Sequence, residues 1–370
     1  VVQAVPRDVD TWAPHEDEGL TFFAVADQLE RSDAEQLAQR IARWRIAEPY
    51  EDTTAELDGF QQPRDILGYY DISDPAAIDF GALWGPRSDI NSPENLRIPF
   101  GNRADNGELM ILDIKDMNTG GDGPHGVLSG TTGSGKTTLI RTMIEALILG
   151  HPPQNLQMVL ADCKGGAGVK PFENTPHVPH IITDLEDDQV LMDRFITAMW
   201  GEIARRKTIC NNIGADDADE YNLIRAERAV RGEQLPPLPR LLVVLDEFKE
   251  AFRIKPDLPD VLDQIGRQGR SLWVHMLLAS QDIDSRAERL LENVGYRIVL
   301  RQNTSASASA AGVPAAVNLP KEVGGGYLRL GLADDLTRFR AESLWRDYRK
   351  PGNADEMVSE ISNPGSNYLE

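Results

Sequence analysis

Residues 130–137 read GTTGSGKT, a glycine-rich stretch that ends in a lysine and a threonine. Gly133 and Gly135 let the backbone curl, so that successive N–H groups point at phosphate oxygens. Lys136 can then reach the terminal phosphates, and the Thr137 hydroxyl can take one Mg²⁺ position. The alternative is a glycine-rich turn that caps a helix, which leaves the lysine without a role. The pattern predicts a phosphate-binding loop formed by Gly130, Thr131, Thr132, Gly133, Ser134, Gly135, Lys136, Thr137 and Thr138.

Two carboxylates that could take part in chemistry, Asp246 and Glu247, follow the apolar run in RLLVVLDEF at 240–248. A buried strand delivers carboxylates to a site in this way at its carboxyl end. Asp246 is predicted to hold Mg²⁺ through water, and Glu247 to polarise an attacking water. A DE pair can also begin a helix, but with the glycine-rich loop upstream we favour the catalytic interpretation. A glutamate after the aspartate favours hydrolysis over binding alone.

Polar residues also end two other apolar runs. Ser280 and Gln281 follow HMLLA, where Gln281 can touch a terminal phosphate or the attacking water. A solvated loop is the alternative there. Asp162 and Lys164 in LADCKGG either border the same pocket or form a plain ion pair between strand and loop.

Two arginines close the amphipathic stretch FITAMWGEIARRK at 195–207. Arg205 and Arg206 are ordinary surface charges if they only complement the negative end of a helix dipole. In a ring of subunits, an arginine that projects into the neighbour's site accelerates phosphoryl transfer. The residue types alone leave both interpretations open.

The elements that must position these residues alternate along the chain from Leu96 onward. Short apolar runs alternating with helical patterns are typical of a parallel sheet covered on both faces. The predicted strands are 108–113, 125–129, 156–162, 240–246, 273–280 and 296–301, and the predicted helices include 136–149, 187–210 and 257–268. The sequence therefore predicts an α/β domain at 96–345.

The first 95 residues differ in composition from the rest. A capping box formed by Ser32 and Glu35 predicts a helix at 32–46, which would close a preceding domain at 1–48. Residues 49–95 are rich in Pro, Asp and Gly and are predicted to be a linker that wraps the main domain. Its candidate anchors are Trp84, Tyr69 and Tyr70. A polar tail or interdomain linker is predicted at 346–370.

Composition narrows the possible partners. The net charge of −21 opposes binding to nucleic acid, which uses Lys and Arg to neutralise phosphates. Cys163 and Cys210 are predicted to be free thiols, and no Cys/His spacing typical of zinc is present. No apolar run approaches the ~18–20 residues that span a bilayer, so we expect a soluble piece of a longer protein.

The motifs together resemble the FtsK/SpoIIIE-type P-loop ATPases. Finer features are similar to the first ATPase domain of the EccC-type ATPases of type VII secretion. These features are LRIPFG at 96–101, GPHGVLSGTTGSGKTTLIRT at 123–142, KGGAG at 164–168, HIITDLED at 180–187, GRQGRSLWVHMLLASQ at 266–281, YRIVLRQNTSASASAAGVP at 296–314 and NLPKEVGGGYLRLG at 318–331. The resemblance covers about 96–331.

The resemblance implies a RecA-like motor that hydrolyses ATP with Mg²⁺ in a homo-oligomeric, hexameric ring. It also implies attachment to a secretion machine on the cytoplasmic side of the plasma membrane. The expected partners are further ATPase domains, membrane components and small helical secreted substrates. It makes Arg205 or Arg206 the inter-subunit arginine, so an isolated monomer should hydrolyse ATP weakly.

Two rival functions stay open from the sequence. One is a DNA translocase of the same fold, and the other is an ATP-binding regulatory domain with negligible hydrolysis. DNA-moving relatives have TQRP after the strand that ends near 280, whereas this chain has SQDID at 280–284. No basic DNA-reading winged-helix domain is present in the sequence either. Both departures argue against DNA as a partner.

Overall fold

The structure is a computed structural model that describes residues 65–344, except 167, 184–188, 284–286 and 332–335. The predicted helix at 32–46, the predicted domain end at 1–48 and the predicted tail at 346–370 lie outside the described residues. Within the described part of the chain, no helix is long and apolar enough to cross a membrane.

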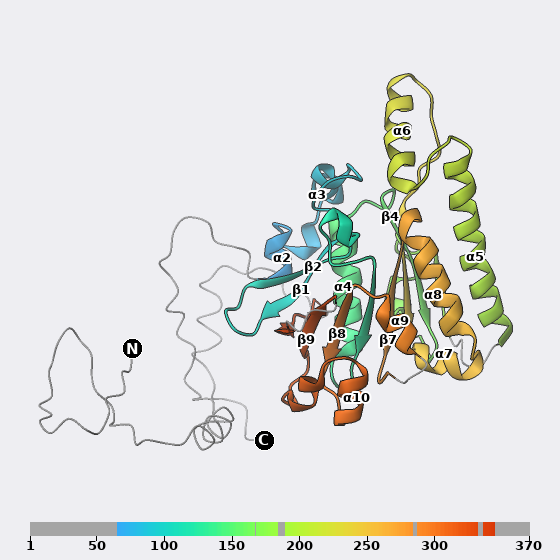
Figure 1. The fold of residues 1–370 in the computed structure, drawn as a ribbon. Helices are drawn as coiled ribbons and strands as arrows, with labels where there is room; N and C mark the ends of the chain where they lie inside the picture. The colour runs from blue at the N-terminus through green and yellow to red at the C-terminus, as the bar shows by residue number, and fades with distance from the viewer. Residues whose placement is uncertain (1–64, 167, 184–188, 284–286, 332–335, 345–370) are drawn as a thin grey trace, which may run out of the picture. The chain divides into compact units, whose positions relative to one another are not determined.

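One sheet organises the described residues (Figure 1). Its strands run in the order β2-β1-β10-β9-β8-β3-β7-β6-β4-β5. Their bounds are β1 Arg97–Arg103, β2 Leu109–Asp113, β3 His125–Ser129, β4 Leu156–Asp162, β5 His180–Ile182, β6 Arg240–Asp246, β7 Val274–Ser280, β8 Tyr296–Leu300, β9 Gly325–Leu330 and β10 Leu336–Ala341. The strands from β8 to β5 are parallel, and β9, β10, β1 and β2 pair antiparallel. The predicted α/β fold with a mainly parallel central sheet is confirmed.

The central strands are buried on both faces, which explains their continuous apolar sequences. In β6 every position is buried. Leu242 and Val244 belong to the core on one face of the sheet, whereas Val243 and Leu245 belong to the core on the other. The sheet therefore separates two hydrophobic cores.

Helices cover both faces. The α4 helix (Lys136–Gly150) packs Leu139, Met143 and Leu147 into one core, and short α2 (Ile66–Tyr69) lies on the same side. The opposite core is covered by α5 (Gln189–Asn211), α7 (Phe248–Ile254) and α8 (Leu258–Gly269), as Figure 1 shows. The remaining helices are α3 Phe80–Trp84, α6 Ala218–Val230, α9 Glu288–Glu292 and α10 Ser305–Ala310.

Residues 65–95 carry aromatic side chains that attach to the end of α4. The Tyr70 hydroxyl donates to the Ala146 carbonyl at 2.7 Å, and the Trp84 indole N–H donates to the Ile148 carbonyl at 3.0 Å. The Tyr69 hydroxyl donates to Glu94 at 2.9 Å. The Ile148 carbonyl is one of the last four of α4, which have no partner within the helix, so Trp84 satisfies one of these groups, whereas Tyr70 adds a second hydrogen bond to a carbonyl just before them.

Candidate nucleotide-binding site

The glycine-rich loop connects β3 to α4 at the centre of the sheet. β3 lies between β7 and β8, so the loop emerges beside the carboxyl ends of both neighbours. Gly133 and Gly135 have φ of 77° and 99°, a left-handed conformation that glycine adopts without strain. Lys136 then begins α4, whose first N–H groups have no intrahelical partner. The predicted strand–loop–helix arrangement is present, and it is suited to bind phosphate.

The loop is held from both sides. The N–H of Gly130 donates to the Ser280 carbonyl at 3.2 Å, and the Thr131 N–H and hydroxyl both donate to the Arg301 carbonyl, at 3.2 Å and 3.0 Å. Thr132, Gly133 and Thr137 are exposed, and Thr138 is half-buried. Ser134 is buried, and its hydroxyl has no hydrogen-bond partner among the described residues. The loop is therefore exposed at Thr132 and Gly133 but fixed by hydrogen bonds at Gly130 and Thr131.

Lys136 lies between the two predicted carboxylates. Its Nζ contacts Asp246 Oδ1 and lies 2.8 Å from Glu247 Oε1. Burial of the ammonium acts to lower the pKa of Lys136, but the two carboxylates outweigh it and the pKa is raised. The lysine is therefore a cation at neutral pH, held at the carboxyl end of β6.

Glu247 has an unusual backbone. Its φ is 56° and ψ 41°, the left-handed region that non-glycine residues rarely occupy. Its N–H donates to Asp246 Oδ1 at 2.8 Å, and α7 begins directly after it. Strain of this kind is characteristic of functional positions. Here it turns the Glu247 side chain back toward Lys136.

Asp162 is a third carboxylate at this edge. It ends β4 and is paired in register with Asp246. Burial, together with repulsion from Asp246, raises the pKa of Asp162 to about 6. The backbone N–H of Lys164 donates to Asp162 at 2.7 Å and acts in the opposite direction, lowering the pKa. The Lys164 side chain is exposed. Of the two sequence interpretations, the geometry favours Asp162 bordering the pocket.

The residues after β7 reach the loop directly. Gln281 Oε1 accepts a hydrogen bond from the Thr132 hydroxyl at 3.1 Å. Ser280 is fully buried, and its carbonyl holds the Gly130 N–H. The Gln281 side chain therefore contacts the loop, whereas Ser280 contacts it through its carbonyl, and the role of Gln281 at a terminal phosphate stays a prediction.

Several residues of the site were not predicted from the sequence. Gln302 is buried and donates to the Ser129 hydroxyl at 2.9 Å, and the Gly324 N–H donates to the Ser134 carbonyl at 2.9 Å. Lys249 pairs with Asp282 at 2.6 Å. Gln302 follows the end of β8, so the rule that singled out Gln281 also indicates it. Nothing in the sequence around Gly324 indicates its contact.

The two candidate arginines have opposite environments, which corrects the prediction for Arg206. The side chain of Arg206 is 2% exposed, and that of Arg205 is 50% exposed. Arg206 donates to Glu202 at 2.7 Å and to the Leu272 and Pro239 carbonyls at 2.8 Å each. Arg206 therefore binds its own fold and is not available to a neighbour. A signal was present in the sequence: Met199, Ile203, Arg206 and Cys210 share one helical face, and all are buried.

Thr137 and Asp246 were predicted to hold Mg²⁺. A Cβ placed on Gly168 would lie 3.1 Å from Thr137 Cγ2 and 4.0 Å from Asp162 Oδ2, so Thr137 and Asp162 flank the same point. A hydroxyl and two carboxylates form the all-oxygen donor set that Mg²⁺ prefers. These donor types fit the ion, and Mg²⁺ binding by Thr137 and Asp246 stays a prediction. Cys163 and Cys210 are buried free thiols, as predicted.

The fold and the phosphate-binding loop indicate the class of protein to which this chain belongs. The FtsK/SpoIIIE family model matches residues 84–319, and the chain belongs to this family.

Two relatives and one solved structure give finer similarity. The chain is 58% identical over 352 residues to the ESX-5 secretion system protein EccC5 of Mycobacterium tuberculosis. The aligned region covers 95% of this chain and 25% of that protein. It is 40% identical over 327 residues to the ESX secretion system protein EccC of Thermomonospora curvata, and this alignment covers 88% of this chain and 24% of that protein. The solved cytoplasmic domain of the T. curvata type VII secretion ATPase EccC matches with a TM-score of 0.70 and 41% identity, covering 76% of this chain and 32% of that one. The chain thus spans about a quarter of the length of these relatives.

Proposed function

We propose that this chain is an ATP-hydrolysing motor domain of a type VII protein secretion machine. In this proposal it acts in an oligomeric, hexameric ring on the cytoplasmic side of the plasma membrane, with further ATPase domains and membrane components as partners. Small helical secreted proteins are the proposed substrates. The family membership and the similarity to EccC proteins of ESX secretion systems support this function.

The contact of Lys136 with Asp246 and Glu247 is the observation that carries the proposal. Residues from two distant motifs meet at the end of β6, where a loop suited to bind phosphate begins. When the phosphates of ATP bind the Lys136 ammonium, Glu247 loses its ion pair with Lys136 and becomes free to accept a proton from water. Mg²⁺ on Thr137 and Asp246 would neutralise phosphate charge.

Strand order orients the nucleotide. Gln281 and Glu247 follow β7 and β6, on one side of β3, so the terminal phosphate belongs on that side. The nucleoside then points toward β8 and β9, on the other side. Val323 precedes β9 and is 60% exposed, and its Cγ1 would lie 2.9 Å from a Cβ on Gly135. We assign Val323 as an apolar contact for the base or ribose.

Arg205 is the remaining candidate for action in trans. It is half-exposed on α5 and is held by Glu202 through two hydrogen bonds of 2.7 Å. Its neighbour Arg206 binds carbonyls at the start of β6 and β7, so this part of α5 lies at the edge of the sheet opposite the loop. Arg205 is thus distant from its own phosphate loop, and we propose that it completes the site of a second subunit.

Replacing Glu247 with Gln tests the hydrolytic role. The variant should still bind ATP, because Lys136 and the loop are unchanged. Its steady-state ATPase rate, measured by phosphate release, should fall by about 10²–10⁴-fold, as for loss of a general base. Glu250→Gln is the matched control, since Glu250 lies on α7 and pairs with Arg253 at 3.1 Å.

Wild-type turnover by Glu247→Gln contradicts the catalytic assignment. The cargo is tested separately, by measuring ATPase activity of the parent with duplex DNA and after fusion to a hexameric scaffold. Stimulation by the scaffold and none by DNA supports the secretion motor. Stimulation by DNA favours a translocase, and negligible hydrolysis in every assembly favours a regulatory ATP-binding domain.

A further inference from the structure

A cavity of about 1010 Å³ lies at the edge of the sheet opposite the phosphate loop. Arg240, Trp273 and His275 line it where β6 and β7 begin. β6 has seven residues, so the length of a strand, ~20 Å, separates this cavity from Asp246. The cavity is therefore distinct from the nucleotide site.

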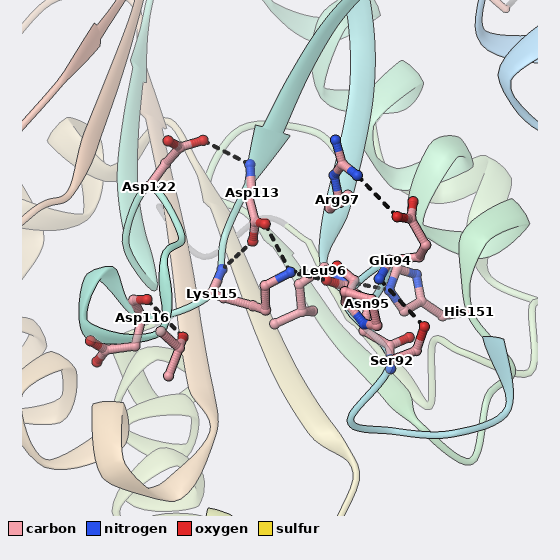
Figure 2. A network of polar contacts seen from close by, with 12 residues as sticks. Ser92, Glu94, Asn95, Leu96, Arg97, Asp113, Lys115, Asp116, Asp122 and His151 are labelled. Carbon is pink, nitrogen blue, oxygen red and sulfur yellow. Dashed lines mark hydrogen bonds and ion pairs between the residues drawn. The ribbon is translucent and has the colours of Figure 1, made fainter.

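One wall of the cavity is a network of charges that satisfy one another, much of which Figure 2 shows. Lys115 Nζ donates to the Pro93 carbonyl at 2.7 Å and pairs with Asp113 at 2.8 Å. The other lining cations are paired too: Arg97 with Glu94 at 3.0 Å, Arg267 with Asp263 at 2.8 Å, and Arg270 with Asp116. These groups need no ligand.

Arg240 is the exception. It is only 8% exposed, and its guanidinium carbon lies 3.9 Å from the centroid of the Trp273 ring. Its Nε is buried without a hydrogen-bond partner, and in residues 65–344, outside the gaps given above, no carboxylate lies within ion-pair distance of its guanidinium. Asp219, also on the cavity wall, instead accepts from the Trp273 indole N–H at 3.1 Å.

The cation of Arg240 persists despite its burial. Burial lowers the pKa of Arg240 to about 10, with Asp219 and Asp113 acting in the opposite direction from a distance. Beside it, His275 is buried, and its pKa lies well below the ordinary value because of that burial and the charge of Arg240. A buried cation without a partner costs folding free energy, so it calls for an explanation.

We propose that this cavity binds a ligand through an oxyanion, a carboxylate or phosphate group, seated on Arg240. The planar guanidinium presents a fork of N–H donors that matches the two oxygens of such a group. Stacking on Trp273 fixes the plane of the fork and leaves its edge for the ligand. The oxyanion belongs either to an acidic polypeptide segment or to a free small anion, and the chemistry at Arg240 is the same.

The test compares the 370-residue wild-type chain with Arg240→Met by isothermal titration calorimetry. The probes are inorganic phosphate, glutarate and the peptide acetyl-Gly-Glu-Gly-amide, each with ADP and Mg²⁺ present to fill the phosphate loop. At least one probe should bind the wild type tenfold or more tightly than Arg240→Met. Arg267→Met is the matched control, because Arg267 lines the same cavity but is paired with Asp263.

The outcome also identifies the source of the oxyanion. Binding of the peptide alone assigns an acidic polypeptide, and binding of phosphate or glutarate assigns a free anion. Arg240→Met should be close to the wild type in stability to urea, because it removes a buried cation that no carboxylate of the described residues neutralises, together with its stacking on Trp273. Equal titrations of the wild type and Arg240→Met with all three probes overturn the proposal. A marked loss of stability also overturns it, by showing that the fold itself satisfies Arg240.

Discussion

The adjacent residues Arg205 and Arg206 on α5 are predicted to have different roles, and replacing each with methionine tests the two roles separately. Methionine keeps most of the side-chain volume, so the comparison reports mainly on polar contacts. Arg206→Met removes donors to the Leu272 and Pro239 carbonyls and one partner of Glu202. Arg205→Met removes only an exposed pair with Glu202.

The magnitudes follow from burial. Removing one member of a buried ion pair costs about 3–5 kcal/mol, and the two carbonyls left without a donor contribute to that loss. Glu202 keeps Arg205 as a partner, so we expect about 3 kcal/mol for Arg206→Met. An exposed pair contributes at most about 1 kcal/mol, so Arg205→Met should be close to the wild type.

Urea unfolding followed by far-UV circular dichroism measures both free energies of unfolding. ATPase activity on the hexameric scaffold then measures the role in trans. Arg205→Met should lower the assembled rate by about 10³-fold or more, as for loss of an arginine that stabilises the transition state. The rate of the unassembled chain should not change.

Two results would refute this reasoning. An unfolding midpoint of Arg206→Met equal to that of the wild type would show that its buried contacts do not stabilise the fold. An assembled Arg205→Met protein with the wild-type ATPase rate would remove Arg205 from the site of the neighbour.

Three further predictions concern the nucleotide site. The pKa of Asp162 is raised to about 6 in the folded state, so its ionisation destabilises the fold as pH rises from about 4 to 6. Asp162→Asn should therefore gain stability over the wild type across that window in urea unfolding, and a difference independent of pH would contradict this. Val323→Ala should weaken ATP binding about fivefold to tenfold and leave tripolyphosphate binding unchanged, by calorimetry, because only the nucleoside loses contact; equal losses for both ligands would place Val323 elsewhere. Glu247→Gly should be more stable than Glu247→Ala by about 1 kcal/mol, because only glycine relaxes at φ 56°; equal urea midpoints would rule out backbone strain.

Local patterns were sufficient for the central strands and the loop. The strand predicted at 240–246 matches β6, and the strand predicted at 273–280 matches β7 to within one residue. Both are continuous apolar runs because they are buried on two faces. The strands β1, β5, β9 and β10 were not predicted: β5 has only three residues, and the other three are not buried along their whole length and lack continuous apolar runs.

The sequence by itself determined the chemistry of the phosphate loop, the acidic pair at 246–247 and the family. These features depend on residue types at short spacing, which the chain carries locally. Only the tertiary structure decided that Lys136 meets Glu247, that Arg206 is buried while Arg205 is exposed, and that Arg240 lies in a cavity with no carboxylate partner among the described residues. Each of these depends on which strands become neighbours. Strand order is set by long-range packing of the whole sheet, and no local periodicity encodes it.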